Sequence, residues 1–437
     1  MAAHKTPSLK QYAPLGQGGR PRRYTLCTTL RCNLACSYCY IAKSCATMSL
    51  TTARRALDFF FGHAASSDNI EIGFFGGEPL LEFPLLQNIT DLIESHPDYD
   101  PARVSLALTT NGTIFSSAIA AFLKAHAFKV CISCDGPPHV QDTFRRTACL
   151  EGTSQVVERT LVAAREALST VLVNVVYHPQ TFRYLPETLD YLSGLGLRRI
   201  FLNPDFSANW TPLEAQELPA IYRAVADRYV NWYLNHTPHF VSLIDMKIAV
   251  LIRGGYHPME RCQMGTGELT IVPDGGIYPC ERLIGSGADG QHRIGSLERG
   301  LDLSSLGCRS VPGTAANSEC CECTLRDSCM NWCGCSNFFM TGDYDRVGPF
   351  LCASERVAIQ TALDVFATLE RQLGPVFLHH LAGEPDFAVA PEKLSRAVSP
   401  QDKPGQRRLL TRKRVETNNK ETEDEPAQRR VDQSHRG

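Results

Sequence analysis

Three closely spaced cysteines near the start of the chain constrain its fold and chemistry more than any other feature. Cys32, Cys36 and Cys39 follow the spacing C-x3-C-x2-C on one short segment. Cysteine thiolates are the usual ligands of iron–sulfur clusters, so these three can hold three irons of a four-iron cubane. The fourth iron is then left without a protein ligand, and an open metal position is where a substrate or cosubstrate binds. Half of a zinc site and a group of buried core thiols are the competing interpretations.

With Tyr38 directly before the last cysteine, this segment resembles the signature of the radical S-adenosylmethionine (SAM) superfamily. The resemblance implies a 4Fe–4S cluster on Cys32, Cys36 and Cys39, whose open iron holds the amine and carboxylate of SAM. It also implies that an electron, from a donor such as flavodoxin or ferredoxin, cleaves SAM to a 5′-deoxyadenosyl radical, which abstracts a hydrogen atom from the substrate. Because such clusters are sensitive to oxygen, we expect an oxygen-poor setting.

Apolar runs alternate with amphipathic segments between about residues 23 and 205, which predicts parallel strands joined by crossover helices. The predicted strands are Tyr24–Thr28, Ile70–Phe75, Val104–Thr109, Lys129–Ser133, Val171–Tyr177 and Arg199–Leu202. The predicted helices are Thr51–His63, Leu81–Glu94, Ser116–Ala127, Gln155–Leu168 and Leu185–Leu195. Six units are too few for a complete eight-stranded barrel. The expected fold class is therefore α/β with a partial (β/α)6 TIM-like barrel, which the family resemblance also implies.

Polar or glycine-rich motifs follow the first four predicted strands, where barrel enzymes place their functional residues. The cysteine loop follows the first strand. The other three motifs are Gly76-Gly77-Glu78-Pro79, Thr109-Thr110-Asn111-Gly112 and Ser133-Cys134-Asp135-Gly136. Taken alone, Gly-Gly and Asn-Gly pairs are common turn formers. Their joint placement after successive strands favours a ligand-binding edge.

The motif after the second predicted strand resembles the GGEP motif that binds the SAM amino group in this superfamily. Gly76 and Gly77 permit close backbone approach to a ligand. Glu78 can accept hydrogen bonds from the SAM ammonium, and Pro79 fixes the turn.

Further cofactor-side residues are implied by the same resemblance. Tyr38 belongs to the cysteine signature, Asn111 and Ser133 resemble residues that contact the SAM ribose or carboxylate, and Asp135 opens the next loop. Arg145 resembles an arginine that pairs with the SAM carboxylate, for which the guanidinium fork is well suited.

A second group of cysteines begins near residue 262. It comprises Cys262, Cys280, Cys308, Cys320, Cys321, Cys323, Cys329, Cys333, Cys335 and Cys352. Seven of these resemble the signature of SPASM domains, the C-terminal extension of many radical SAM enzymes that act on peptides and proteins. A single zinc site on Cys320, Cys323, Cys329 and Cys333 is the alternative, but it leaves the spacing of the other signature cysteines unexplained.

The SPASM resemblance implies two auxiliary 4Fe–4S clusters. The ligands of the first would be Cys262, Cys280 and Cys333. The ligands of the second would be Cys320, Cys323, Cys329 and Cys352. Some family members supply a fourth ligand to the first cluster from a cysteine slightly upstream, but residues 253–259 contain none here. An open iron could then bind a substrate thiolate, unless Cys308, Cys321 or Cys335 fills the position.

Glu281 follows Cys280 directly and is the candidate catalytic residue. Sulfatase-maturating relatives carry an Asp at this position, which is thought to act as a general base, and a Glu can do the same work. A surface carboxylate or a salt-bridge partner is the competing interpretation.

Net charge, apolar runs and cysteine count limit the partners and the compartment that we expect for this chain. The net charge of −2 provides no field that would draw nucleic acid or an anionic membrane to the whole protein. Residues 1–20 lack the apolar run of a signal peptide, and no stretch approaches the ~20 apolar residues of a membrane span. Eighteen cysteines in a chain expected to be cytoplasmic indicate metal or redox chemistry.

The predicted division of the chain has five parts. They are an N-terminal extension (1–22), the radical SAM partial barrel (23–240), the SPASM domain (241–355), C-terminal helices (356–388) and a disordered tail (389–437). The helical part includes a helix predicted over Glu355–Leu373 and a turn at residues 377–381, and the tail has few apolar residues. The extension is too short to be a peptide-recognition domain. A leader peptide would therefore bind the barrel, the SPASM surface or a separate leader-peptide-binding protein.

Together these patterns predict a radical SAM/SPASM oxidoreductase that matures a ribosomally synthesised peptide, for example by thioether cross-linking of a cysteine. The first alternative is an anaerobic sulfatase-maturating enzyme that forms formylglycine. The second is a non-catalytic iron–sulfur electron carrier, which would have no use for the SAM-side residues.

Overall fold

The computed structural model describes residues 21–285, 290–306, 318–374, 376–377 and 380–381. The first 20 residues, Cys308 and the predicted disordered tail at 389–437 lie outside the described residues.

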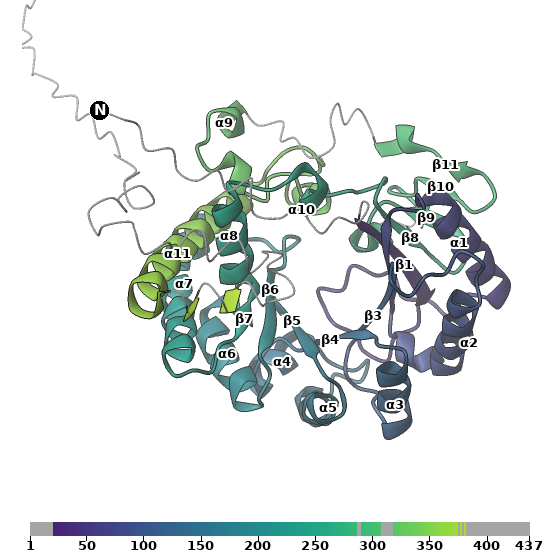
Figure 1. The fold of residues 1–437 in the computed structure, drawn as a ribbon, viewed down its shortest axis with the longest axis horizontal. Coiled ribbons are helices and arrows are strands. Elements are labelled where there is room, and N and C mark those ends of the chain that lie inside the picture. Colours follow the sequence, from purple (N-terminus) through teal and green to yellow (C-terminus); the bar gives the residue numbers. More distant parts are fainter. Residues whose placement is uncertain (1–20, 286–289, 307–317, 375, 378–379, 382–437) are drawn as a thin grey trace, which may run out of the picture. The chain divides into compact units, whose positions relative to one another are not determined.

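One curved sheet organises the described residues, with the strand order β11-β10-β9-β8-β1-β2-β3-β4-β5-β6-β7 (Figure 1). The seven strands on the barrel side are β1 (Pro21–Thr29), β2 (Asn69–Gly76), β3 (Val104–Thr110), β4 (Lys129–Ser133), β5 (Val171–Tyr177), β6 (Arg199–Pro204) and β7 (Phe240–Val241). All neighbouring pairs from β1 to β7 are parallel, so their carboxyl ends share one edge. The four motifs predicted to follow strands therefore lie along that edge.

Helices connect these strands. They are α1 (Leu50–His63), α2 (Phe83–Glu94), α3 (Ser117–Ala125), α4 (Pro138–Phe144), α5 (Ser154–Ala167), α6 (Leu185–Gly194), α7 (Pro212–Leu234) and α8 (Ser242–Arg253). Short 3-10 helices occur at Pro79–Glu82, Phe182–Tyr184, Pro258–Glu260, Glu281–Leu283, Leu303–Leu306 and Arg326–Ser328. The outer face of the sheet packs against the helices through apolar contacts such as the stacked rings of Tyr24 and Phe60, whose centroids are 4.5 Å apart.

The C-terminal part continues the same sheet. Strand β8 (Glu268–Ile271) pairs with β1 in parallel, and β9 (Gly276–Tyr278), β10 (Gly295–Ser296) and β11 (Gly300–Leu301) follow in antiparallel order. The helices here are α9 (Ser318–Cys321), α10 (Gly334–Thr341) and α11 (Pro349–Leu373). The cysteine-rich part is thus joined to the barrel through the β1–β8 pair.

All six predicted strands form, and β4 and β5 have the predicted bounds. The structure differs from the prediction in several places, and it contains the helices α4, α7 and α8, which were not predicted. The helix expected from Leu81 begins as a 3-10 turn at Pro79, and the helix expected from Glu355 begins at Pro349, where the proline occupies the first turn. Two further parallel strands, β7 and β8, extend the six predicted ones, because strands of two and four residues carry too little periodicity to be recognised.

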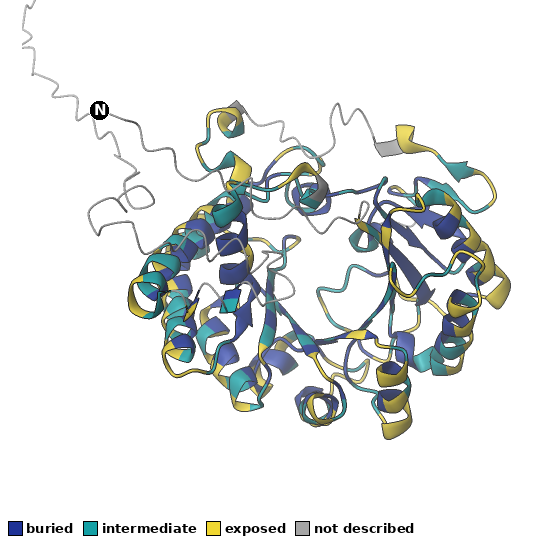
Figure 2. Ribbon diagram, viewed as in Figure 1, coloured by how far each residue is buried: buried dark blue, intermediate teal, exposed yellow. Residues whose placement is uncertain are grey.

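Strand β5 shows that the barrel interior is accessible. Its residues alternate between buried positions (Val171, Val173, Val175) and half-buried positions (Leu172, Asn174). Successive side chains of a strand point to opposite faces, so one face packs on helices and the other lines a partly open interior. Figure 2 shows the resulting band of buried residues between sheet and helices.

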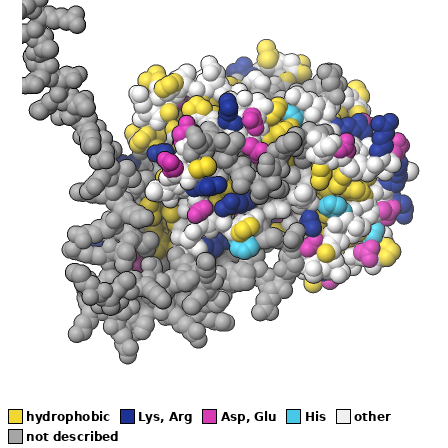
Figure 3. All heavy atoms as spheres, turned by 90° about the horizontal axis from the view of Figure 1, so that it is seen from above, with side chains coloured by type: hydrophobic (Ala, Val, Ile, Leu, Met, Phe, Trp, Pro, Cys, Tyr) yellow, Lys and Arg dark blue, Asp and Glu magenta, His cyan; other side chains and the backbone are white. Residues whose placement is uncertain are grey.

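Charged side chains of both signs are interspersed on the face shown in Figure 3, in keeping with the small net charge. Each helix among the described residues is too short or too polar to cross a bilayer.

Candidate active site

The cysteine loop leaves β1 at the carboxyl edge of the parallel strands. Cys32, Cys36 and Cys39 are half-buried, and the loop turns tightly because the Cys39 N–H donates to the Cys36 carbonyl at 3.1 Å. Burial raises the pKa of the Cys32 and Cys36 thiols, whereas Lys43 acts to lower both and Arg145 acts to lower that of Cys36. Because iron binds thiolates, these two cations favour the ligating form.

Gly76, the last residue of β2, and Gly77, which follows it, pack against the backbone of the cysteine loop. The Gly77 N–H donates to the Thr29 carbonyl and the Glu78 N–H to the Arg31 carbonyl, both at 2.8 Å. A Cβ atom on Gly76 would lie 2.3 Å from the Thr29 oxygen, and one on Gly77 would lie 2.0 Å from the Arg31 oxygen. Gly76 also has φ +139°, which other residues rarely adopt. We expected close approach to a ligand, and the structure shows close approach to the loop that carries the cysteines.

The Glu78 side chain is fully buried and joins two of the motifs. It accepts hydrogen bonds from the Leu80 N–H (3.0 Å), the Thr110 hydroxyl (2.8 Å) and the Asn111 N–H (2.7 Å). Burial raises the pKa of Glu78 to about 7, although the three donors act to lower it. Pro79 begins the 3-10 turn that Glu78 caps.

Asn111 and Ser133 lie at the same edge. The Asn111 amide donates to the Asn33 side-chain oxygen at 2.9 Å and lies 3.7 Å from the Cys32 sulfur, so it reaches into the cysteine loop. Ser133 is the last residue of β4, is buried, and stands in register with Asn174 on β5.

Asp135 links three other parts of the site. It accepts hydrogen bonds from the Tyr38 hydroxyl (2.7 Å) and the Val176 N–H (3.0 Å), and it forms an ion pair with the Arg145 Nε at 3.0 Å. The Arg145 guanidinium also lies 5.3 Å from the centre of the Tyr38 ring. Two residues predicted to contact SAM therefore contact each other and the tyrosine of the cysteine loop.

His178 was not predicted as a site residue. Its ring packs on Tyr38 and Phe144, with centroid separations of 4.5 and 4.1 Å, and its Nδ1 lies 3.2 Å from the Asp205 carboxylate. Burial acts to raise the pKa of Asp205, but hydrogen bonding, that from His178 foremost, holds it below its usual value. The sequence signal was present, since His178 directly follows the apolar run of β5, as the other motifs follow theirs.

Four thiols gather beside β8 and β9. Cys262, Cys280 and Cys335 are buried, the Cys333 and Cys335 sulfurs are 3.7 Å apart, and Cys335 and Cys280 are close enough to interact electrostatically. Cys262 is close enough to Cys280 and Cys333 for their charges to interact. The Arg282 guanidinium lies next to Cys335, Cys333 and Cys280. We call Cys262, Cys280, Cys333 and Cys335 the first thiol group.

Four other cysteines line one small pocket. They are Cys320, Cys323, Cys329 and Cys352, and Arg356 lines the pocket with them. The charge of Arg356 acts on Cys352, Cys323 and Cys329. These four cysteines form the second thiol group.

The zinc site considered from the sequence does not assemble. It required Cys333 beside Cys320, whereas Cys333 contacts Cys335 in the first thiol group. Over the described ranges, no three His, Cys, Asp or Glu side chains converge enough to hold a single metal ion. Zinc ligands must all meet one ion at about 2.3 Å, whereas each thiolate of a cubane binds a different iron.

Glu281 lies in the 3-10 turn after Cys280 and reaches β1. It accepts a hydrogen bond from the Thr25 hydroxyl at 3.2 Å, and its charge acts on Cys131 of β4 and on Arg23. Burial raises the pKa of Glu281, while Arg23 acts to lower it. The hydrogen bond to β1 and the electrostatic effect on β4, two strands separated by β2 and β3, favour an orientation of this carboxylate toward the barrel interior.

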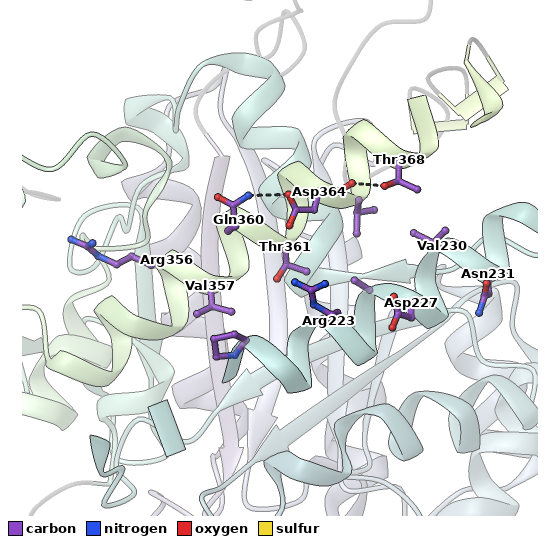
Figure 4. A pocket seen from close by; sticks show the side chains of 13 residues that line it. Arg223, Asp227, Val230, Asn231, Arg356, Val357, Gln360, Thr361, Asp364 and Thr368 are labelled. Atoms are coloured by element: carbon purple, nitrogen blue, oxygen red, sulfur yellow. Dashed lines mark hydrogen bonds between the residues drawn. The ribbon is translucent and has the colours of Figure 1, made fainter. Parts of the chain in front are cut away.

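A hollow of about 610 Å³ lies between α7 and α11 (Figure 4). Arg223 and Asp227 of α7 and Gln360 and Asp364 of α11 line it, with a 2.9 Å hydrogen bond from Gln360 to Asp364. None of the predicted site residues lines this hollow, but Arg356 lines both this hollow and the pocket of the second thiol group.

Residues 26–192 match the family model described as the Radical SAM superfamily. The matching segment holds the cysteine loop and the motifs after β2, β3 and β4.

Three curated relatives illustrate the sequence similarity. An uncharacterized protein of Methanocaldococcus jannaschii is 31% identical over 178 residues, which is 39% of this chain and 58% of that protein, so the chain spans little over half of its length. The serine-type anaerobic sulfatase-maturating enzyme of Klebsiella aerogenes is 25% identical over 317 residues, 69% of this chain and 76% of that protein. The radical SAM cyclopropyl synthase TigE of Paramaledivibacter caminithermalis is 23% identical over 352 residues, 72% of this chain and 68% of that protein.

Solved structures confirm the predicted fold class. The structure of anSMEcpe with bound AdoMet and Cp18Cys peptide superposes with a TM-score of 0.67 at 18% identity, covering 81% of this chain and 99% of that chain. Streptococcus suis SuiB bound to precursor peptide SuiA superposes with a TM-score of 0.53 at 16% identity, covering 76% of both chains.

Proposed function

We propose that this chain is a radical SAM oxidoreductase that modifies a peptide or protein substrate. The observation that carries the proposal is the loop of Cys32, Cys36 and Cys39, held at the carboxyl edge of the barrel by backbone contacts from the motif after β2. The family match at residues 26–192 and the similarity to a sulfatase-maturating enzyme and to TigE support it.

The cysteine loop suits a 4Fe–4S cluster. Its three thiols are half-buried on one short turn, and Lys43 and Arg145 stabilise negative charge at the sulfurs. When bound, such a cluster supplies an electron and an open iron for SAM. A flavodoxin or ferredoxin would deliver that electron.

The SAM-side residues divide by their contacts. Asn111 and Ser133 stand at the edge itself and would contact SAM directly. Glu78, which ties two loops together, would receive the SAM ammonium. Asp135 and Arg145 would act by holding Tyr38. Arg145 would then be a positioning residue, with its charge directed at Cys36 of the cysteine loop as well.

The two thiol groups are proposed as auxiliary cluster sites, with SPASM organisation from about residue 241. The separation of Cys333 from the second thiol group supports the division of ligands that the SPASM resemblance implies. Two clusters near the barrel would give the substrate radical a path for losing its electron.

Glu281 favours formylglycine formation as the reaction. Oxidising the Cβ of a Cys or Ser to an aldehyde oxidation level removes one hydrogen atom, one electron and one proton from the side chain. The hydrogen atom would go to the 5′-deoxyadenosyl radical, the electron to an auxiliary cluster and the proton to a base. With a Cys target, the resulting thioaldehyde would then be hydrolysed to the aldehyde with release of hydrogen sulfide. Glu281 points into the barrel and has a raised pKa because it is buried, as suits a general base.

Thioether cross-linking of a peptide cysteine is the second candidate. The similarity to TigE and the fold likeness to SuiB, which was solved with a precursor peptide, favour a ribosomally made substrate. A separate leader-peptide-binding protein would then be a partner.

The test uses protein reconstituted with iron and sulfide under anaerobic conditions, with SAM and a chemical reductant. We expect 5′-deoxyadenosine to form and a sulfatase active-site peptide to gain an aldehyde that hydrazide reagents trap. Failure to cleave SAM would reject the radical SAM proposal. SAM cleavage that leaves the sulfatase peptide unchanged would direct attention to precursor peptides.

A further inference from the structure

We propose that Cys335 is the fourth thiolate ligand of the first auxiliary cluster, with Cys262, Cys280 and Cys333, so that this cluster has no open iron. The inference rests on the proposed function, because it assumes that the first thiol group holds a 4Fe–4S cluster. It concerns a cysteine outside the seven-residue signature.

The placement of Cys335 carries the proposal. It is one of the most buried of the described cysteines, at 4% exposure, and its sulfur lies 3.7 Å from that of Cys333. It also lies close enough to Cys280 to interact with it electrostatically. Each thiolate of a cubane binds its own iron, so the Cys333 and Cys335 sulfurs would separate when the cluster loads. A buried thiol that lies next to two of the proposed ligands is placed where a further ligand of the same cluster would be.

The other spare cysteine among the described residues is placed differently. Cys321 ends α9 and is exposed, and its neighbour Cys320 belongs to the second thiol group. It therefore has no route to the first thiol group without breaking the second. Cys335 instead lies in the first turn of α10, two residues after Cys333.

The upstream segment that supplies the fourth ligand in some relatives has another role here. Tyr256 accepts a hydrogen bond from Lys247 at 3.3 Å, and its ring packs edge-on against Trp332 at 4.9 Å. The Tyr256 N–H donates to the Asp327 carbonyl. Aromatic packing thus occupies this segment, which contains no cysteine.

Arg282 supplies the matching charge. A fourth thiolate makes the cluster more negative than three would, and buried negative charge is costly unless it is paired. The Arg282 guanidinium is half-buried beside Cys335, Cys333 and Cys280, with Cys335 its strongest thiol neighbour. A cation at this point stabilises a fully ligated cluster.

A fully ligated first cluster changes the expected chemistry. It can accept an electron, but it cannot bind a substrate thiolate. This favours formylglycine formation, which needs no iron-bound substrate, over thioether formation on an open iron.

The test isolates the auxiliary sites. Protein in which Cys32, Cys36 and Cys39 are replaced by Ala serves as the background, so that the SAM cluster contributes no signal. Cys335→Ala and the closer mimic Cys335→Ser are added to it, with Cys321→Ala and Cys308→Ala as matched controls. Iron content and electron paramagnetic resonance spectra are recorded after reconstitution, after mild oxidation, and with free cysteine as the thiol probe.

We expect the background and both controls to keep about 8 irons and to ignore added cysteine. Both Cys335 variants should either lose one iron on mild oxidation and give a three-iron signal, or lose the whole first auxiliary cluster, which is about four irons. Where the cluster is retained, its spectrum should change when cysteine is added. Unchanged spectra in both Cys335 variants, or a background that already binds cysteine, would overturn the proposal. The proposed function is tested by a separate assay, because it would be rejected if the unmodified protein did not cleave SAM.

Discussion

The carboxylate of Glu78, after β2, accepts a hydrogen bond from the backbone N–H of Asn111, after β3, at 2.7 Å. Since the Asn111 amide in turn reaches Asn33 and Cys32, this bond connects the GGEP-like motif to the cysteine loop through a third motif. A change at Glu78 should therefore affect SAM binding and the mutual position of the loops together.

The first prediction concerns Glu78→Gln. The neutral amide is a weaker partner for the SAM ammonium than the carboxylate, and its NH2 group, which replaces one carboxylate oxygen, must face at least one group that donates to that oxygen in the unmodified protein. Losing one charge-assisted hydrogen bond costs about 1.5–3 kcal/mol, so SAM affinity should fall roughly ten- to a hundredfold while iron content stays unchanged. Equilibrium dialysis of SAM measures the effect.

Glu82→Gln is the control for this prediction, because Glu82 lies in the same turn and pairs with the exposed Arg31 at 2.8 Å. Exposed pairs contribute little, so SAM affinity should stay within a few-fold of the unmodified protein. Equal SAM affinity in Glu78→Gln and the unmodified protein would mean that the GGEP-like motif forms a turn and does not bind SAM.

The second prediction is a pH dependence of stability. Burial raises the folded-state pKa of Glu78 to about 7, above the ordinary value of 4.5. Between these pH values the unfolded chain loses the proton while the folded chain keeps it. The free energy of unfolding of the apoprotein, relative to that of Glu78→Gln, is therefore highest below pH 4.5. That difference should shrink by about 3 kcal/mol as the pH rises to 7 and then level off. Paired denaturation curves of both apoproteins from pH 5 to 8 provide the measurement, and a difference that grows with pH would contradict it.

Much of the fold was predictable because buried strands appear in the sequence as apolar runs. The apolar run Val171–Tyr177 became β5 with unchanged bounds, and the motif residues Glu78, Asn111 and Asp135 all follow their strands at one edge. Parallel pairing then brings residues that are 30 or more positions apart into contact without any further information.

The features that were not predicted are contacts between residues that are far apart in the sequence and that meet only in the folded chain. Composition does not distinguish Cys335 from Cys321, yet one is buried among thiols and the other is exposed. Arg145 could have paired with a ligand, and only the three-dimensional arrangement shows it beside Asp135. His178 was missed because a lone histidine after a strand has no motif around it.

The third prediction concerns iron. Anaerobically reconstituted protein should hold about 12 irons, as three cubanes, and the triple change of Cys32, Cys36 and Cys39 to Ala should leave about 8 and abolish SAM cleavage. Iron assay and chromatography of 5′-deoxyadenosine give both readouts. Full SAM cleavage by the triple variant would refute the role of these cysteines.

The fourth prediction concerns His178, which packs on Tyr38 and pairs with Asp205. His178→Ala should remove an aromatic contact of about 0.5–1.5 kcal/mol and slow SAM cleavage roughly two- to tenfold, with iron content unchanged. His178→Phe keeps the ring and should restore most of the rate if the histidine only positions Tyr38. A histidine that exchanges protons would instead leave the Phe variant as slow as the Ala variant.

The last prediction separates the two candidate reactions through Glu281. If Glu281 is the base for oxidation at Cβ, Glu281→Gln should cleave SAM at a comparable rate but lose aldehyde formation by about 100-fold or more, the usual range for a general base. Peptides with Cys or Ser at the target position should both be turned over by the unmodified protein, because neither needs to bind iron. Glu268→Gln is the matched control, since Glu268 is a neighbouring carboxylate whose charge acts on Glu281.

The opposite pattern would favour thioether formation. Hydroxyl groups are far poorer iron ligands than thiolates, so an iron-bound substrate predicts an active Cys peptide and an inactive Ser peptide. It also predicts that Glu281→Gln keeps product formation. That pattern would contradict a fully ligated first cluster as well, so the peptide assay and the spectra of the Cys335 variants test the same chemistry from the substrate side and from the metal side.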